Sequence, residues 1–97
     1  GCTMDAEGML WVALWGGHAI ARWNPETGEC IQRIRLPVKH VTAMAFGGED
    51  LQTLFITTAK ASWAGLDEPD AGKLFVCQPG AKGLKANVFD PVDKANP

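Results

Sequence analysis

The feature that most constrains the fold of this chain is an internal repeat. Leu10-Trp11-Val12 is matched by Leu54-Phe55-Ile56 at an offset of 44 residues, and Asn24-Pro25 is matched by Gln78-Pro79 at an offset of 54. The ten additional residues fall in one loop, residues 60–70. A repeat of this length made of four short strands is typical of a β-propeller blade. The sequence therefore predicts blades, and the alternative is an eight-stranded sandwich, which does not explain the repeat.

Turn signals separate short runs of residues that favour strands. The strongest turn is Asn24-Pro25-Glu26-Thr27-Gly28, where Pro25 restricts φ and Gly28 supplies a left-handed position. The expected strands are 2–4, 10–15, 19–23, 30–36, 42–46, 53–58, 72–77 and 84–89. The prediction is an all-β fold of two four-stranded antiparallel blades. Residues 1–38 form the first blade, 39–89 the second with an insertion at 60–70, and 90–97 a flexible tail.

Composition and charge exclude several classes of protein. Hydrophobic residues make up 46% of the chain, charged residues 21%, and the net charge is −2, which indicates a globular domain without a basic patch for nucleic acid. The longest uncharged apolar run, Met9 to Trp15, is far shorter than the ~20 residues of a membrane span. A G-x-S-x-G nucleophile motif and a phosphate-binding glycine loop are both absent from the sequence.

The three cysteines indicate a reducing compartment. Cys2, Cys30 and Cys77 are odd in number and widely spaced, which argues against a disulfide framework and against a zinc site. We expect Cys30 and Cys77 to be buried free thiols, because both lie in apolar strand-like runs. A cytoplasmic location follows as an expectation.

Several motifs carry a resemblance to a known family. They are Asp5-Ala6-Glu7-Gly8-x-Leu10-Trp11-Val12-Ala13, Arg22-x-Asn24-Pro25, Leu36-Pro37-Val38 and Thr42-x-x-x-Phe46-Gly47-Gly48. Together they resemble the gluconolactonase, regucalcin and senescence-marker-protein family. The resemblance implies a six-bladed β-propeller that hydrolyses sugar lactones with a divalent metal, calcium or zinc. It also implies that this chain corresponds to the last two blades of a longer protein.

The same resemblance implies that the metal ligands lie outside this chain. In the family a metal-binding Asp stands in a Pro-Asp-Gly-Met motif, and Gly1-Cys2 aligns with its Gly-Met. The ligand would therefore directly precede Gly1. We expect neither catalytic nor metal-binding residues, and no cofactor, in this chain. The parent family is enzymatic, but we expect the chain alone to be inactive. The alternative is a non-catalytic β-domain that self-assembles or binds a small ligand.

Four residues are candidates for contact with a small sugar lactone: Trp15, His18, His40 and Trp63. Loops between second and third strands lie at the same end as the start of the first strand, which is the mouth of the channel in a complete propeller. Plain packing or exposure is the alternative reading for each, and His40 departs from the small or amide residue of the family. The carboxylates of the first-to-second-strand turns, Asp5 and Glu7 among them, are expected at the opposite end as solvated turn residues.

Two blades alone would leave two apolar sheet faces uncovered. We therefore expect either self-association or packing against missing N-terminal blades. Self-association would take the form of a ring of three chains or a strand-swapped dimer. A nucleic-acid partner and a membrane partner are not expected.

Overall fold

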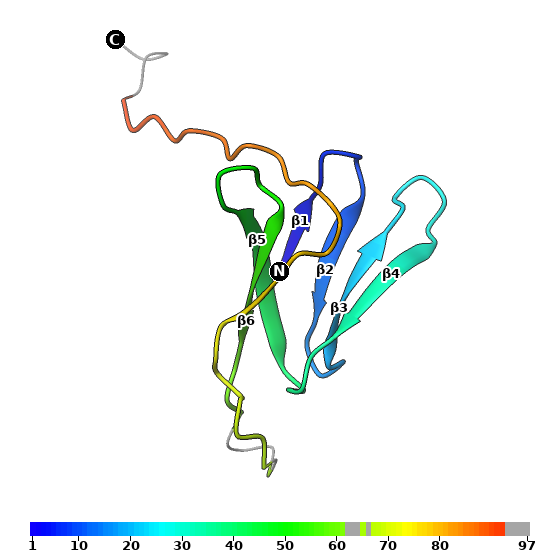
Figure 1. Cartoon of the computed structure of the whole chain (residues 1–97), viewed down its shortest axis with the longest axis vertical. Helices are drawn as coiled ribbons and strands as arrows, with labels where there is room; N and C mark the ends of the chain where they lie inside the picture. Colours follow the sequence, from blue (N-terminus) through cyan, green and yellow to red (C-terminus); the bar gives the residue numbers. More distant parts are fainter. Residues whose placement is uncertain (62–64, 66, 93–97) are drawn as a thin grey trace.

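The chain folds into two antiparallel β-sheets that pack face to face (Figure 1). The computed structural model describes residues 1–61, 65 and 67–92. The strands in this part of the chain are β1 (Cys2–Met4), β2 (Leu10–Leu14), β3 (Ala19–Trp23), β4 (Cys30–Arg35), β5 (Val41–Gly47), β6 (Thr53–Thr58) and β7 (Phe75–Cys77). The first sheet has the order β1-β2-β3-β4 and the second the order β5-β6-β7.

Tight turns between neighbouring strands follow from local sequence chemistry. In the β3–β4 turn the Asn24 side chain accepts a hydrogen bond from the Glu26 amide at 3.0 Å, and the Gly28 amide donates to the Asn24 carbonyl at 2.8 Å. Gly28 has a φ of 77°, a conformation that glycine adopts at little cost. The turn therefore forms where Asn, Pro and Gly predicted it.

The second sheet repeats the strand pairing of the first. Trp11 of β2 pairs with Thr3 of β1, and Phe55 of β6 pairs with Ala45 of β5. On the other side of these strands, Trp11 pairs with Arg22 of β3 and Phe55 pairs with Val76 of β7. Trp11 and Phe55 are the residues that the sequence repeat matched at an offset of 44. The repeat is thus structural as well as sequential.

The core lies between the two sheets. Trp11 is fully buried, and its ring meets the ring of Phe46 edge to face with centroids 5.8 Å apart. Leu54 and Ile56 of β6 are also buried in this layer. Among the described residues, the buried cluster is Trp11, Ile20, Leu36, Val38, Val41, Met44, Leu54, Ile56 and Ala81. Alternate residues of each strand point into this layer, as expected for sheets that are buried on one face.

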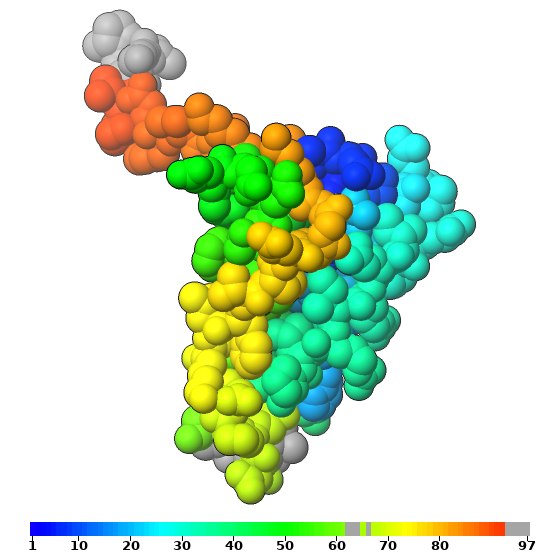
Figure 2. Space-filling view, in the orientation of Figure 1, coloured from blue at the N-terminus to red at the C-terminus, as the bar shows by residue number. Residues whose placement is uncertain are grey.

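The segment after β7 crosses from the second sheet to the first (Figure 2). The Gln32 side chain donates to the Pro79 carbonyl at 3.0 Å, and the Ala6 amide donates to the Lys82 carbonyl at 2.7 Å. The Gly83 amide in turn donates to the Leu51 carbonyl at 2.8 Å. Residues 79–83 therefore tie β4, the β1–β2 turn and the β5–β6 turn together at one end of the molecule.

The fold class is confirmed, with three corrections in detail. The strand expected at 84–89 is not formed, because this segment runs away from both sheets and Leu84, Val88 and Phe89 are exposed. The strand expected at 72–77 is shorter, since its first residues form a turn and an extended connection instead. Cys30 is exposed and Cys77 half-buried, so the expected burial of Cys30 is wrong. It lies at the edge of the outermost strand of the first sheet.

The division of the chain at residue 38 and the flexible tail at 90–97 stay predictions. Within the described residues there is no helix with the length and apolar character to cross a membrane.

Replacing Gly83 with alanine tests the crossing segment. A Cβ at this position would lie 2.3 Å from the Cβ of Phe46, so the segment or the Phe46 side chain has to shift. We expect the free energy of unfolding to fall by about 1–3 kcal/mol. Urea denaturation followed by tryptophan fluorescence measures this, with the exposed neighbour substitution Leu84→Ala as the control. An unchanged midpoint for Gly83→Ala would show that residue 83 is loosely held.

Candidate functional site

The sheets have two distinct ends. β1 and β5 begin side by side, since the amino group of Gly1 donates to the Thr42 carbonyl at 2.6 Å. Trp15 and His40 lie at this end, which we call the Trp15 end. Asp5 follows β1 at the other end, which we call the Asp5 end and which also holds the crossing segment.

Trp15 and His40 form a packed aromatic pair. The two residues form an isolated antiparallel bridge between the end of β2 and the start of β5. Their ring centroids are 4.2 Å apart and the ring planes are inclined by 44°. Trp15 is 56% exposed whereas His40 is 6% exposed, so the indole covers the imidazole and faces solvent itself. This pair supplies a solvent-facing aromatic surface supported from beneath.

His18 has a structural role in the loop beside this pair. Its φ is 56°, in the left-handed region that residues other than glycine adopt infrequently. The His18 amide donates to the Lys39 carbonyl at 3.2 Å, and the His18 carbonyl accepts from the Leu36 amide at 2.7 Å. His18 thus joins the β2–β3 loop to the connection between the sheets. The described contacts of His18 are made by its backbone.

Three polar residues that the sequence analysis did not select also lie at the Trp15 end. The hydroxyls of Thr42 and Thr57 share a hydrogen bond of 2.6 Å, and the Lys39 amide donates to a carboxylate oxygen of Glu68 at 2.9 Å. Glu68 anchors the insertion to the start of β5. The pairing of β5 with β6 could have suggested the contact between Thr42 and Thr57. The contact between Glu68 and the Lys39 amide joins residues distant in sequence, and no local sequence pattern predicts it.

The described residues at this end do not fit a divalent metal. Such an ion needs several convergent carboxylate, imidazole or carbonyl ligands. Among the described residues no three His, Cys, Asp or Glu side chains are grouped in this way. The Thr42 and Thr57 hydroxyls bond to each other, and one oxygen of Glu68 accepts a backbone amide. No chemical step through a metal can therefore be assigned to these residues.

The structure thus brings together two of the four candidates, Trp15 and His40, and places His18 in the adjoining loop. The fourth candidate, Trp63, lies outside the described residues. Contact of any of the four with substrate stays a prediction.

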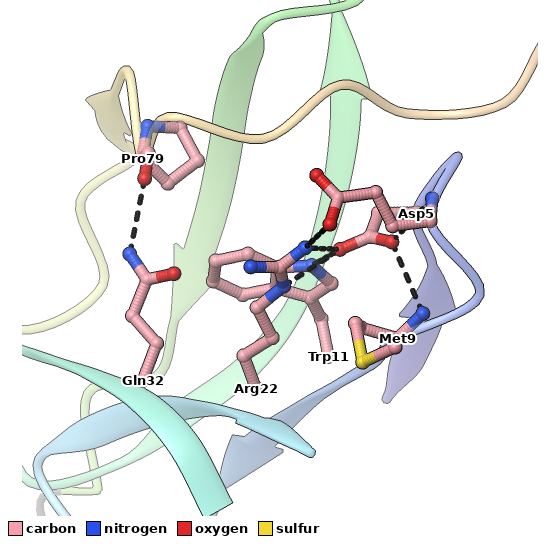
Figure 3. Close-up of polar contacts among 7 residues, drawn as sticks. Asp5, Met9, Trp11, Arg22, Gln32 and Pro79 are labelled. Atoms are coloured by element: carbon pink, nitrogen blue, oxygen red, sulfur yellow. Dashed lines mark hydrogen bonds and ion pairs between the residues drawn. The ribbon is translucent and has the colours of Figure 1, made fainter. Parts of the chain in front are cut away.

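The Asp5 end contains a buried carboxylate at the centre of a hydrogen-bond network (Figure 3). Asp5 is 1% exposed, so its expected place as a solvated turn residue is wrong. Its Oδ2 accepts from Trp11 Nε1 at 2.9 Å and from Arg22 Nε at 2.8 Å, while Oδ1 accepts from the Glu7 and Met9 amides. The Arg22 guanidinium also lies 5.6 Å from the centre of the Trp11 ring.

These contacts determine the ionisation of Asp5. Burial by itself raises the pKa of the carboxyl, but the hydrogen bonds from Trp11, Met9, Arg22 and Glu7 together lower the pKa below its ordinary value. The carboxylate is therefore charged and fully bonded in the folded state. It closes the β1–β2 turn and holds Trp11 and Arg22 in place, which is a structural function.

The strand order and the repeated strand pairing of the two sheets define the class of fold. The chain is a pair of propeller-type blades. It resembles two solved structures, each over 87% of this chain and 29% of the solved one. The luciferin-regenerating enzyme has a TM-score of 0.76 at 32% identity. The calcium-binding protein regucalcin from Agrobacterium tumefaciens strain C58 has a TM-score of 0.75 at 33% identity.

The family follows from the sequence comparison. Residues 1–60 match the family model "SMP-30/Gluconolactonase/LRE-like region", and the chain belongs to this family. It is also 46% identical over 95 residues to the "Putative sugar lactone lactonase YvrE" of Bacillus subtilis strain 168. That match covers 95% of this chain and 31% of YvrE, so the chain spans less than a third of the relative's length.

Substituting Asp5 with asparagine tests the buried network. Asparagine keeps the shape of the side chain but removes the buried charge that pairs with Arg22 at 2.8 Å. The largely buried guanidinium then keeps only the exposed carboxylate of Glu7, at 3.5 Å, as an ion-pair partner. We expect a loss of about 2–4 kcal/mol in the free energy of unfolding at pH 7. Urea denaturation measures the loss. Asp50→Asn is the matched control, because Asp50 accepts a backbone amide in an exposed turn. Equal effects of the two substitutions would contradict the assignment.

The lowered pKa of Asp5 also predicts a direction for acid sensitivity. An unfolded aspartate has a pKa of about 3.9, so below roughly pH 5 the unfolded chain takes up protons at this site before the folded chain does. The stability contributed by Asp5 is present above the unfolded pKa and is lost as the pH falls through the folded pKa. The difference in unfolding free energy between the wild type and Asp5→Asn should therefore shrink below about pH 4. A difference that is constant from pH 7 to pH 3 would contradict it.

Proposed function

We propose that this chain forms two blades of a metal-dependent sugar-lactone hydrolase, and that the metal ligands are supplied by residues outside it. Membership of the gluconolactonase family supports the activity. The similarity to YvrE, named as a sugar lactone lactonase, supports the substrate class. The calcium-binding description of the Agrobacterium regucalcin supports a divalent metal.

The geometric observation that carries the proposal is the Trp15–His40 pair beside the start of β1. Gly1 lies next to Thr42 at the beginning of the two neighbouring strands β1 and β5. The family resemblance implies a metal-binding Asp directly before Gly1, and in this proposal that residue would lie at this same end. The exposed indole of Trp15 would contact the apolar C–H face of the lactone ring, with His40 holding the indole in place.

In this proposal the residues of this chain bind and orient the substrate. Trp15 provides contact area, His40 restricts the orientation of the indole, and the Thr42 and Thr57 hydroxyls lie on the strands beside it. The bound metal would polarise the lactone carbonyl and activate water. A reducing, cytoplasmic location is part of the proposal, supported by three cysteines that are free in the structure.

The activity is tested with two proteins. The 97-residue chain itself should show no hydrolysis of glucono-lactone above the buffer rate, with or without Ca²⁺ or Zn²⁺. A chimera in which this chain replaces the matching 31% of YvrE should show metal-dependent hydrolysis. Turnover by the isolated chain would overturn the proposed location of the ligands. A folded, metal-loaded chimera without activity, beside an active YvrE, would overturn the proposed function.

The role of Trp15 is tested in the same chimera. We expect Trp15→Ala to raise KM about tenfold, the equivalent of ~1.4 kcal/mol of binding, with a smaller change in kcat. Phe89→Ala removes an exposed aromatic side chain far from this end and serves as the control. An unchanged KM for Trp15→Ala would show that the indole does not contact the substrate.

A further inference from the structure

A half-buried glutamate joins the insertion to the connection between the two sheets. Glu68 Oε2 accepts a hydrogen bond from the Lys39 amide at 2.9 Å, across a separation of 29 residues. Lys39 lies in the connection between β4 and β5, and its neighbours Val38 and His40 are buried. A hydrogen bond to a carboxylate is stronger than one to a neutral acceptor. The carboxylate therefore holds the backbone of this connection at a defined point.

The Lys39 peptide lies directly beside the Trp15–His40 pair. The Lys39 carbonyl accepts from the His18 amide at 3.2 Å, while its own amide donates to Glu68, so two loops hold this residue. The next residue, His40, is 6% exposed, and its ring centroid lies 4.2 Å from that of Trp15. The path of the backbone at Lys39 therefore contributes to where the imidazole lies beneath the indole.

The sequence around Glu68 restricts the position of its side chain. Glu68 begins a turn in which the Ala71 amide donates to the Glu68 carbonyl at 3.1 Å. Pro69, the second residue of this turn, has a restricted φ that suits the position. Directly after the turn, the Gly72 amide donates to the hydroxyl of Thr58, the last residue of β6, at 3.0 Å. The turn that carries the carboxylate is thereby attached to the second sheet.

We propose that Glu68 is a positioning residue of the candidate site, which acts through the Lys39 amide to fix the His40 ring beneath the Trp15 indole. In the variant Glu68→Ala the partly buried Lys39 amide loses its acceptor, and the connection has to move toward water or another acceptor. Such a movement displaces His40, which follows Lys39 directly. The positioning of the aromatic pair is a property of the folded chain, whereas its consequence for a lactone rests on the proposed function.

Asp70 provides a comparison within the same insertion. Its Oδ1 accepts from Lys73 Nζ at 2.8 Å, and the side chains of Asp70 and Lys73 are 44% and 65% exposed. This ion pair lies within one short segment, and exposed pairs of this kind contribute little to stability. Because Glu68 and Asp70 carry the same charge two residues apart, Asp70→Ala is the matched control for Glu68→Ala.

The positioning role is tested by NMR spectroscopy on the 97-residue chain. In Glu68→Ala, exchange of the Lys39 amide with solvent should accelerate about tenfold. The ring resonances of His40 should move toward those of an unstructured peptide, because the neighbouring Trp15 ring shifts them in the wild type. Glu68→Gln keeps an oxygen that accepts the amide, so it should retain both properties of the wild type, as should Asp70→Ala.

The His40 resonances distinguish a positioning role from a purely stabilising one. If exchange at Lys39 accelerates in Glu68→Ala while the His40 ring resonances stay in place, Glu68 only stabilises the insertion and the proposal is overturned. Unchanged exchange at Lys39, or equal changes in Asp70→Ala, would also overturn it. Should Glu68→Ala fail to fold, Glu68→Asp takes its place, because it keeps the charge and draws the carboxylate back by one methylene.

The consequence for the substrate is measured in the chimera with YvrE. Glu68→Ala should raise the KM for glucono-lactone about threefold with a smaller change in kcat, because Glu68 acts only through Lys39 and His40. Glu68→Gln and Asp70→Ala should keep the KM of the unsubstituted chimera. An unchanged KM for Glu68→Ala in an active chimera would overturn the proposal. A folded, metal-loaded chimera without activity would instead count against the proposed function, while the NMR measurements still decide whether Glu68 positions the pair.

Discussion

The packing of the Trp11 face of the first sheet against Leu54 and Ile56 of the second is the contact on which the molecule depends. Within residues 1–61, 65 and 67–92, neither sheet has another large apolar layer that is covered, and a small sheet is stable only when one face is buried. Among the described residues, the buried core therefore consists of side chains from β2, β3, β5 and β6, together with Leu36, Val38 and Ala81 from the connecting segments. The Trp15 end and the Asp5 end keep fixed relative positions because both are attached to the buried core between the sheets.

The Asp5 network and the crossing segment close one end of this layer. Asp5 holds the indole N–H of Trp11, so the largest side chain of the core is fixed by a buried charge as well as by packing. Residues 79–83 lie over the same end and bond to both sheets. The other end carries the exposed indole of Trp15 and the starts of β1 and β5. The hydrogen-bonded Asp5 end therefore forms scaffold, whereas the exposed aromatic surface at the Trp15 end forms the candidate site.

Much of the fold was predictable because hydrophobic alternation and turn residues act locally. The repeat at Leu10 and Leu54 indicated two equivalent sheets, and the Asn24–Gly28 turn appeared where its residue types require it. The segment 84–89 was mispredicted because a strand needs a partner, and no neighbouring strand lies beside this segment. Asp5 was mispredicted because a carboxylate in a turn is usually solvated. Its burial depends on Arg22, which is far away in sequence.

The candidate site was predictable in part, because the positions of its loops follow from local sequence patterns. Loop position placed Trp15, His18 and His40 at one end, yet the tilted contact of the Trp15 ring with the His40 ring depends on how the two sheets pack. By itself the sequence determined the strand-rich class, the family and the repeat, because these follow from local patterns of residue type. The tertiary structure decided the burial of Asp5, the crossing segment and the pairing of the two aromatic residues. Each of these depends on contacts between residues distant in sequence, which form only when the sheets meet.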